Sequence, residues 1–249
     1  MTAVSVDNAS QRRAIGGLKG LRLPWAAFPI AILNWVCIAA HWTTLQNISK
    51  PATIVVLILW FHAETRNIAH GWSSPRTWFL IGLLFSLGGD VLLIPSGSGY
   101  FDAGLACFLA AHVCYIAGFN RPWVAPGGLT AVFALVLGTY AVLLYRHLYP
   151  HLPGAMKIIV AVYATALTLM ALSSLETWRR PDWVHVAALL ASAGGLIFLS
   201  SDSMLALNRF ITTKKDNELA VMMTYYLGQF GIISGVVNRR FEQVTAVQR

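Results

Sequence analysis

Long apolar segments alternate with short polar connections along most of this chain. As α-helices, these segments are long enough to cross a hydrocarbon layer of about 30 Å, although the second is short. The pattern predicts an all-α fold, a polytopic membrane protein built as a bundle of eight transmembrane helices, in a domain spanning residues 24–237. An N-terminal tail (1–23) and a C-terminal tail (238–249) flank it. The expected helices are residues 24–42, 51–63, 77–94, 103–119, 126–145, 156–175, 183–207 and 219–237.

The composition supports this class, because 57% of the residues are hydrophobic and only 11% are charged. An ordinary soluble domain has about 25% charged residues. The first apolar segment lacks a cleavage-type run of small residues and is followed by further spans, so we expect no cleaved signal peptide. Cys37, Cys107 and Cys114 lie within apolar segments and form no CxxC pair, which favours packing over a disulfide or a metal site.

The net charge of +8 comes from short flanks between the apolar segments rather than from one basic surface. With eight spans, both termini and the connections 64–76, 120–125 and 176–182 share one side of the membrane. Twelve of the 18 Lys and Arg residues fall on that side. The positive-inside rule therefore places both termini in the cytoplasm, and this distribution argues against nucleic acid as a partner.

Three ionisable residues, Asp90, His112 and Asp202, lie well inside predicted spans. An ionisable group in a span costs roughly 2.5–3.5 kcal/mol on insertion scales, so such residues point to function. Counting a rise of about 1.5 Å per residue puts both acids in the outer half of the membrane and the histidine nearer the midplane. Other polar side chains share the depth of the acids: Lys50, Tyr225 and Tyr226, with Gln229 one turn deeper.

Two acids that share a low-dielectric pocket cannot both ionise easily. Asp90 and Asp202 would then provide a protonated carboxyl group beside a carboxylate, a pair of groups that is common in acid catalysis. Taken singly, the same residues also have structural explanations. Each acid can hydrogen-bond neighbouring helices, His112 can pack in the core, the tyrosines can be interface aromatics, and Lys50 can extend its ammonium to the membrane surface.

A short internal similarity links the two halves of the chain. The segment FSLGGD at 85–90 resembles FLSSD at 198–202, and YIAGF at 115–119 resembles YLGQF at 226–230. The acid precedes the tyrosine by 25 residues in the first half and by 24 in the second. A parallel 4+4 repeat would bring the two acids together across a pseudo-twofold axis.

Five motifs, in order along the chain, resemble the signatures of the YhhN-type lysoplasmalogenases. The resemblance extends over the second to eighth spans, with the fifth and sixth contributing only hydropathy, and it implies an eight-span integral membrane hydrolase. Members of that family cleave the vinyl-ether bond of lysoplasmalogens, giving a fatty aldehyde and glycerophosphocholine or glycerophosphoethanolamine. The motifs are SKPATI (49–54), LLFSLGGDVLL (83–93), GLACFLAAHVCYIAGF (104–119), GGLIFLSSDSMLALNRF (194–210) and MTYYLGQFGI (223–232).

The resemblance implies roles for the matching residues. Asp90 in the GDxxL motif and Asp202 in the SD motif are the expected catalytic pair. One delivers a proton to the β-carbon of the vinyl ether, and the other stabilises the resulting cation and orients water. We expect the lysophospholipid to enter from the bilayer at a site toward the outer leaflet, with water as co-substrate and without a cofactor, a metal or an obligate protein partner. The expected substrate-binding residues are Lys50, His112, Tyr225, Tyr226 and Gln229.

Three other functions are compatible with acids inside a membrane. An intramembrane aspartyl protease would need a glycine where this chain has Leu87 in its LGGD segment, and no YD acid is found on another span. A proton- or ligand-coupled transporter or receptor would use the same acids, and the internal similarity fits it. A catalytically silent scaffold would not need the clustered polar residues.

Overall fold

The computed structural model describes residues 21–68, 71–212 and 217–240, so most of both expected tails lies outside the described residues. Within that part of the chain the fold is all-α, and short 3₁₀ turns at Tyr149–His151 and Glu176–Arg179 follow α6 and α7. The α-helices are α2 Ala27–Ala39, α3 Thr43–Thr65, α4 Pro75–Leu92, α5 Ser98–Phe119, α6 Gly128–Leu148, α7 Met156–Leu175, α8 His185–Phe210 and α9 Glu218–Val237.

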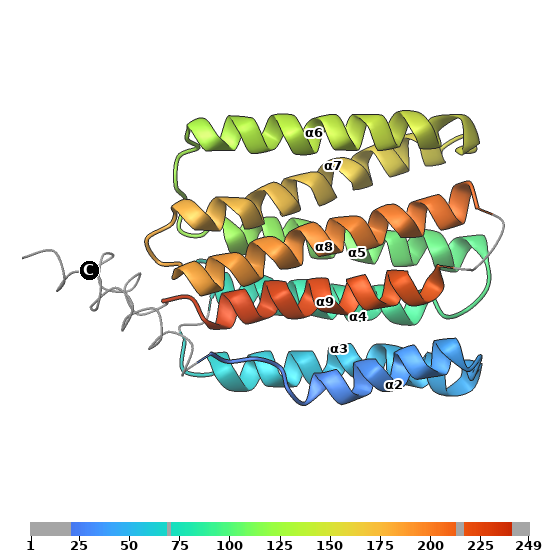
Figure 1. Ribbon diagram of the computed structural model, residues 1–249, viewed down its shortest axis with the longest axis horizontal. Helices are drawn as coiled ribbons and strands as arrows, with labels where there is room; N and C mark the ends of the chain where they lie inside the picture. Colours follow the sequence, from blue (N-terminus) through green and yellow to red (C-terminus); the bar gives the residue numbers. More distant parts are fainter. Residues whose placement is uncertain (1–20, 69–70, 213–216, 241–249) are drawn as a thin grey trace, which may run out of the picture.

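Consecutive helices run in opposite directions, so the connections alternate between the two ends of one bundle (Figure 1). At one end, here called the distal end, α2, α4, α6 and α8 finish and α3, α5, α7 and α9 begin. The other end, called the terminal end, carries the last residue of α9, Val237. Helix α6 lies at one edge of the bundle, and α2 and α3 lie at the opposite edge (Figure 1).

Six of these helices, α3 and α5 to α9, are long and apolar enough to cross a membrane. Helix α2 is apolar but has only 13 residues, and α4 has 18. A chain with this many spanning-length apolar helices is a polytopic helical membrane protein, which confirms the all-α, multi-span part of the prediction.

The second helix begins earlier than the expected range 51–63, because α3 starts at Thr43 and contains Pro51 in its interior. Sequence reasoning treated the polar residues before the proline as a connection. Their polar groups are instead satisfied inside the bundle: the Asn34 side chain donates to the Gln46 carbonyl and to Ser49 Oγ, both at 3.0 Å. A proline is tolerated in such a helix because neighbouring groups satisfy the local backbone. Lys50 therefore lies within the helix rather than at its start.

The closest helix packing lies between α8 and α9 and between α4 and α5. A Cβ atom added at Gly194 of α8 would meet the backbone of Gly231 and Ile232 of α9. On α4, Gly89 leaves room for the Phe108 ring of α5. Glycine at such positions lets helix backbones approach closely. These two helix pairs carry both acids, so the packing fixes the positions of the acids.

The bundle is least buried at α6. Only 6% of the apolar window of α6 is buried, against 72% for α9, and α6 packs mainly against α7. Its outer surface is therefore suited to lipid, whereas α9 is a central helix.

At the terminal end, a buried ion pair joins the residues after α9 to the connection before α8. A guanidinium nitrogen of Arg239 lies 2.6 Å from the Asp182 carboxylate. Burial lowers the pKa of Arg239 to about 10, and the negative charge of Asp182 opposes that change. Arg239 therefore remains charged at neutral pH, and the pair ties the last helix to the rest of the bundle.

Candidate active site

Asp202 of α8 is held by side chains from two other helices. The Tyr163 hydroxyl of α7 donates to Asp202 Oδ2 at 2.6 Å. His112 Nε2 of α5 lies 3.2 Å from the same oxygen and 3.1 Å from the Tyr163 hydroxyl. The His112 side chain is fully buried, whereas 8% of the Asp202 side chain is exposed. Three helices thus fix the orientation of one carboxyl group.

Asp90 of α4 has a corresponding set of partners. The Tyr225 hydroxyl of α9 donates to Asp90 Oδ2 at 2.8 Å, and the Lys50 ammonium of α3 lies 3.6 Å from Oδ1. The Asp90 side chain is 1% exposed and that of Lys50 is 17% exposed. Tyr226 donates to the Lys50 backbone carbonyl at 3.4 Å, so it contacts the backbone of this cluster rather than the acid.

The two clusters are neighbours. The Phe198 ring packs edge-on against both His112 and Tyr225, with ring centroids 5.2 and 5.5 Å apart. The structure therefore brings together six polar residues from six helices, each acid with its own partners: Lys50, Asp90, His112, Tyr163, Asp202 and Tyr225.

Gln229, the remaining sequence-predicted site residue, belongs to a separate polar layer. Its side chain accepts a hydrogen bond from the Tyr115 hydroxyl at 2.8 Å and donates one to Ser86 Oγ at 3.0 Å. All three residues are buried. These bonds link α4, α5 and α9 next to the acid clusters.

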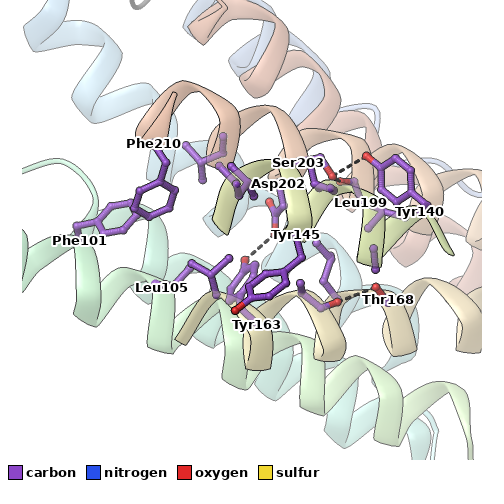
Figure 2. Close-up of a pocket in the computed structure, with 18 residues that line it drawn as sticks. Phe101, Leu105, Tyr140, Tyr145, Tyr163, Thr168, Leu199, Asp202, Ser203 and Phe210 are labelled. Atoms are coloured by element: carbon purple, nitrogen blue, oxygen red, sulfur yellow. Dashed lines mark hydrogen bonds between the residues drawn. The ribbon is translucent and has the colours of Figure 1, made fainter. Parts of the chain in front are cut away.

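An apolar cavity of about 60 Å³ lies beside Asp202, between α5, α6, α7 and α8. Figure 2 shows the carboxyl group of Asp202 and the hydroxyl of Tyr163 meeting at its centre. Phe101 and Phe210 line it near the distal end, and Tyr140 lines the opposite part (Figure 2). Apolar walls with a few polar groups are typical of small-molecule sites.

A second cavity, more polar, opens at the distal end between α3, α4, α8 and α9. Lys50, Asn208, Arg209 and Glu218 are among its lining residues, and its volume is about 430 Å³. Phe101 lines both cavities, as does Leu205. The apolar and polar cavities therefore meet at these two side chains.

Sequence reasoning missed Tyr163, which lies in a span that showed no motif. A spacing signal could have found it. Tyr163 precedes Asp202 by 39 residues, and Lys50 precedes Asp90 by 40. Tyr225 in turn follows Asp202 by 23 residues, as His112 follows Asp90 by 22. The spacings in the two halves of the chain, α2–α5 and α6–α9, therefore match within one residue. Each acid is contacted by one residue of its own half and by one residue of the other half.

The described residues contain no group of three or more His, Cys, Asp or Glu side chains placed to hold a metal ion. The three cysteines are free, and they lie on α2 and α5.

Comparison with known proteins identifies the family of this chain. The model of the YhhN family matches residues 45–236. The chain belongs to the YhhN family. The human protein named lysoplasmalogenase TMEM86A is 31% identical over 207 residues, which cover 80% of this chain and 83% of the relative. Mouse lysoplasmalogenase TMEM86B is 30% identical, covering 83% and 81%. A Mycobacterium bovis protein named lysoplasmalogenase is 30% identical, covering 68% and 63%.

The YhhN match begins within α3 and ends in α9, so it contains both acid clusters, and α2 precedes it. Membership confirms the resemblance stated from the five sequence motifs. No solved structure matches the chain significantly.

Proposed function

We propose that this protein is a lysoplasmalogenase, an integral membrane hydrolase that cleaves the vinyl-ether bond of lysoplasmalogens. The products are a fatty aldehyde and a glycerophospho-headgroup. The observation that carries the proposal is a carboxyl group, Asp202, held by Tyr163 and His112 in the wall of an otherwise apolar cavity. The names of the YhhN relatives support the same activity.

Asp202 is the general acid in this proposal. Both of its partners contact Oδ2, which leaves Oδ1 to carry the transferable proton. His112 Nδ1 is buried without a partner in the described part of the chain, so the ring proton is better placed on Nε2, where Oδ2 accepts it. Tyr163 and His112 are positioning residues that hold Oδ2 while Oδ1 points to the substrate.

The reaction proceeds by protonation, hydration and collapse. Asp202 Oδ1 transfers its proton to the β-carbon of the vinyl ether, giving an oxocarbenium-like cation. Water adds to the cationic carbon and returns a proton to Asp202, as the acid of a glycosidase later acts as a base. The hemiacetal then breaks its bond to the glycerol oxygen, which leaves as an alcohol, and the aldehyde remains.

Asp90 is the ionised member of the pair. One of its oxygens faces the Lys50 ammonium and the other accepts from Tyr225, so both are used as acceptors. Its negative charge favours the cation formed next to Asp202, and it fixes Lys50 at the wall of the polar cavity. Tyr226 and Gln229 support this arrangement through the Lys50 backbone and the neighbouring polar layer.

We propose that all eight described helices cross the membrane and that the two halves, α2–α5 and α6–α9, are a parallel repeat. The matching spacings around Asp90 and Asp202 support the repeat. The lateral route for a lipid is beside α6, the least buried helix, which covers the apolar cavity. In this arrangement residues 24–237 form the membrane domain between the two expected tails.

The orientation that we propose places the terminal end in the cytoplasm and both acids toward the outer leaflet, because most Lys and Arg residues flank the terminal end. Ser96→Cys, at the distal end, should react with a membrane-impermeant maleimide in intact cells. Ser73→Cys, in the α3–α4 connection, should react only after permeabilisation. The reverse labelling pattern would invert the orientation.

The activity is tested with purified protein in detergent and a defined 1-alkenyl lysophospholipid. We expect aldehyde release from the alkenyl substrate and none from the matching saturated 1-alkyl ether, because only a vinyl ether can be protonated at carbon. In H₂¹⁸O, the glycerol product should retain ¹⁶O, since the bond breaks on the alkenyl side. A protein that releases no aldehyde but accumulates the lysolipid in sealed vesicles would be a transporter instead.

A further inference from the structure

The polar cavity at the distal end carries charges of both signs. Arg209 of α8 lies over the Phe101 ring, with its guanidinium carbon 4.3 Å from the ring centroid. A ring holds a guanidinium in place without neutralising its charge. Glu218 of α9 accepts a hydrogen bond from the Gln46 side-chain amide at 2.6 Å, and this donor carries no charge. Both Arg209 and Glu218 line the cavity.

The cationic groups in this cavity come from separate helices. Lys50 of α3 lines the cavity with its ammonium anchored on Asp90, and Arg209 lines it from α8, with Asn208 beside it. Guanidinium and ammonium groups together are a common phosphate-binding set. The carboxylate of Glu218 is the acidic group on the same wall, and a quaternary or primary ammonium is its natural partner.

The position of the cavity relative to Asp202 matches the length of a lysolipid headgroup. Arg209 follows Asp202 by seven residues on α8, so the two lie on one face of the helix, about 10 Å apart along its axis. The glycerol unit places three carbon atoms between the phosphate oxygen and the ether oxygen. The long side chain of Arg209 can span the remaining distance to the phosphate. The hydrocarbon chain would continue past Phe101 and Leu205 into the apolar cavity.

We propose that the polar cavity recognises a zwitterionic headgroup, phosphoethanolamine or phosphocholine, with Arg209 and Lys50 on the phosphate and Glu218 on the ammonium. This assignment rests on the proposed function, because it takes the substrate to be a lysophospholipid cut at Asp202. It makes Arg209 and Glu218 specificity-determining residues. A lysolipid with a bare phosphate headgroup lacks the ammonium and leaves Glu218 facing additional negative charge.

The test uses three alkenyl lysolipids that share one chain and carry phosphoethanolamine, phosphocholine or phosphate. For the wild type, kcat/KM should be about tenfold or more higher for the zwitterionic pair than for the phosphate, since one charged contact is worth about that factor. Glu218→Gln keeps the acceptor for Gln46 and should remove this preference by lowering only the zwitterionic values. Arg209→Gln should raise KM about tenfold for all three with kcat little changed.

Arg146→Gln is the matched control, because Arg146 is an exposed arginine near the distal end of α6 and lines neither cavity. Competition between a fluorescent lysolipid and the non-cleavable 1-alkyl analogues provides a second readout that needs no turnover. Headgroup-selective binding of the lysolipids without release of aldehyde would overturn the proposed function and support this inference. Aldehyde release with a headgroup preference unchanged in Glu218→Gln, or a KM unchanged in Arg209→Gln, would overturn the inference alone.

Discussion

Asp202→Asn should release aldehyde about 10²- to 10⁴-fold more slowly than the wild type, which is the usual contribution of a positioned general acid. Asparagine has the shape of aspartic acid and still accepts from Tyr163 through its side-chain oxygen, but it has no acidic proton to transfer to carbon. The loss should appear in kcat, with KM changed by less than about threefold, because the interaction is made in the transition state. Initial rates with the alkenyl substrate measure both constants.

Asp102→Asn is the matched control, since Asp102 is an exposed acid in the first turns of α5 and lines neither cavity. It should keep wild-type kcat. Tyr163→Phe removes one hydrogen bond to Asp202 and should cost about tenfold in kcat with KM preserved, as expected for loss of one hydrogen bond that positions the acid. Full activity in a folded Asp202→Asn protein would remove Asp202 from the mechanism.

Gly194→Ala should lower the thermal stability of the protein in detergent more than any other single-methyl addition in the α8–α9 contact. The added Cβ would meet the backbone of α9 at Gly231 and Ile232, and a backbone cannot turn aside as a side chain does. Overpacking of this kind typically costs about 1–3 kcal/mol, which corresponds to a fall of about 2–12 °C in Tm for a chain of this length.

Gly138→Ala tests whether that cost comes from the contact. Gly138 lies within α6 and has nothing within 4 Å of an added Cβ, so the substitution should leave Tm unchanged or raise it slightly through helix propensity. Gly194→Ala should also reduce activity, because α8 and α9 carry Asp202 and Tyr225. Equal Tm values for both variants would show that α8 and α9 tolerate separation.

Hydropathy alone was enough to predict the helical class and most helix boundaries, since a lipid environment leaves a segment few alternatives to an apolar helix. It failed at α3, where six of the eight residues from Thr43 to Lys50 are polar. Those residues are helical because Asn34 and Glu218, distant in sequence, provide hydrogen-bond partners for Gln46 and Ser49. Hydropathy does not register partners that come from other helices.

The candidate site also contains residues that the sequence predicted and residues that only the structure showed. The insertion cost of an ionisable group marked Asp90, His112 and Asp202, and depth along each helix grouped them with Lys50 and Tyr225. Depth says nothing of rotation about a helix axis. Tyr163 was therefore not found, and the deeper Gln229 was grouped with the acids although it hydrogen-bonds Tyr115 and Ser86.

The sequence by itself determined the family, the alternation of the helices and the presence of two acids in the membrane domain, because local composition and motifs carry that information. Only the tertiary structure decided which partner each acid has. Lys50 and Tyr225 contact Asp90. Tyr163 and His112 contact Asp202, which lies at the wall of the apolar cavity. Two of those pairings, Tyr225 with Asp90 and His112 with Asp202, depend on how the glycine contacts between α8 and α9 and between α4 and α5 rotate four helices against one another, and rotation is a property of packing.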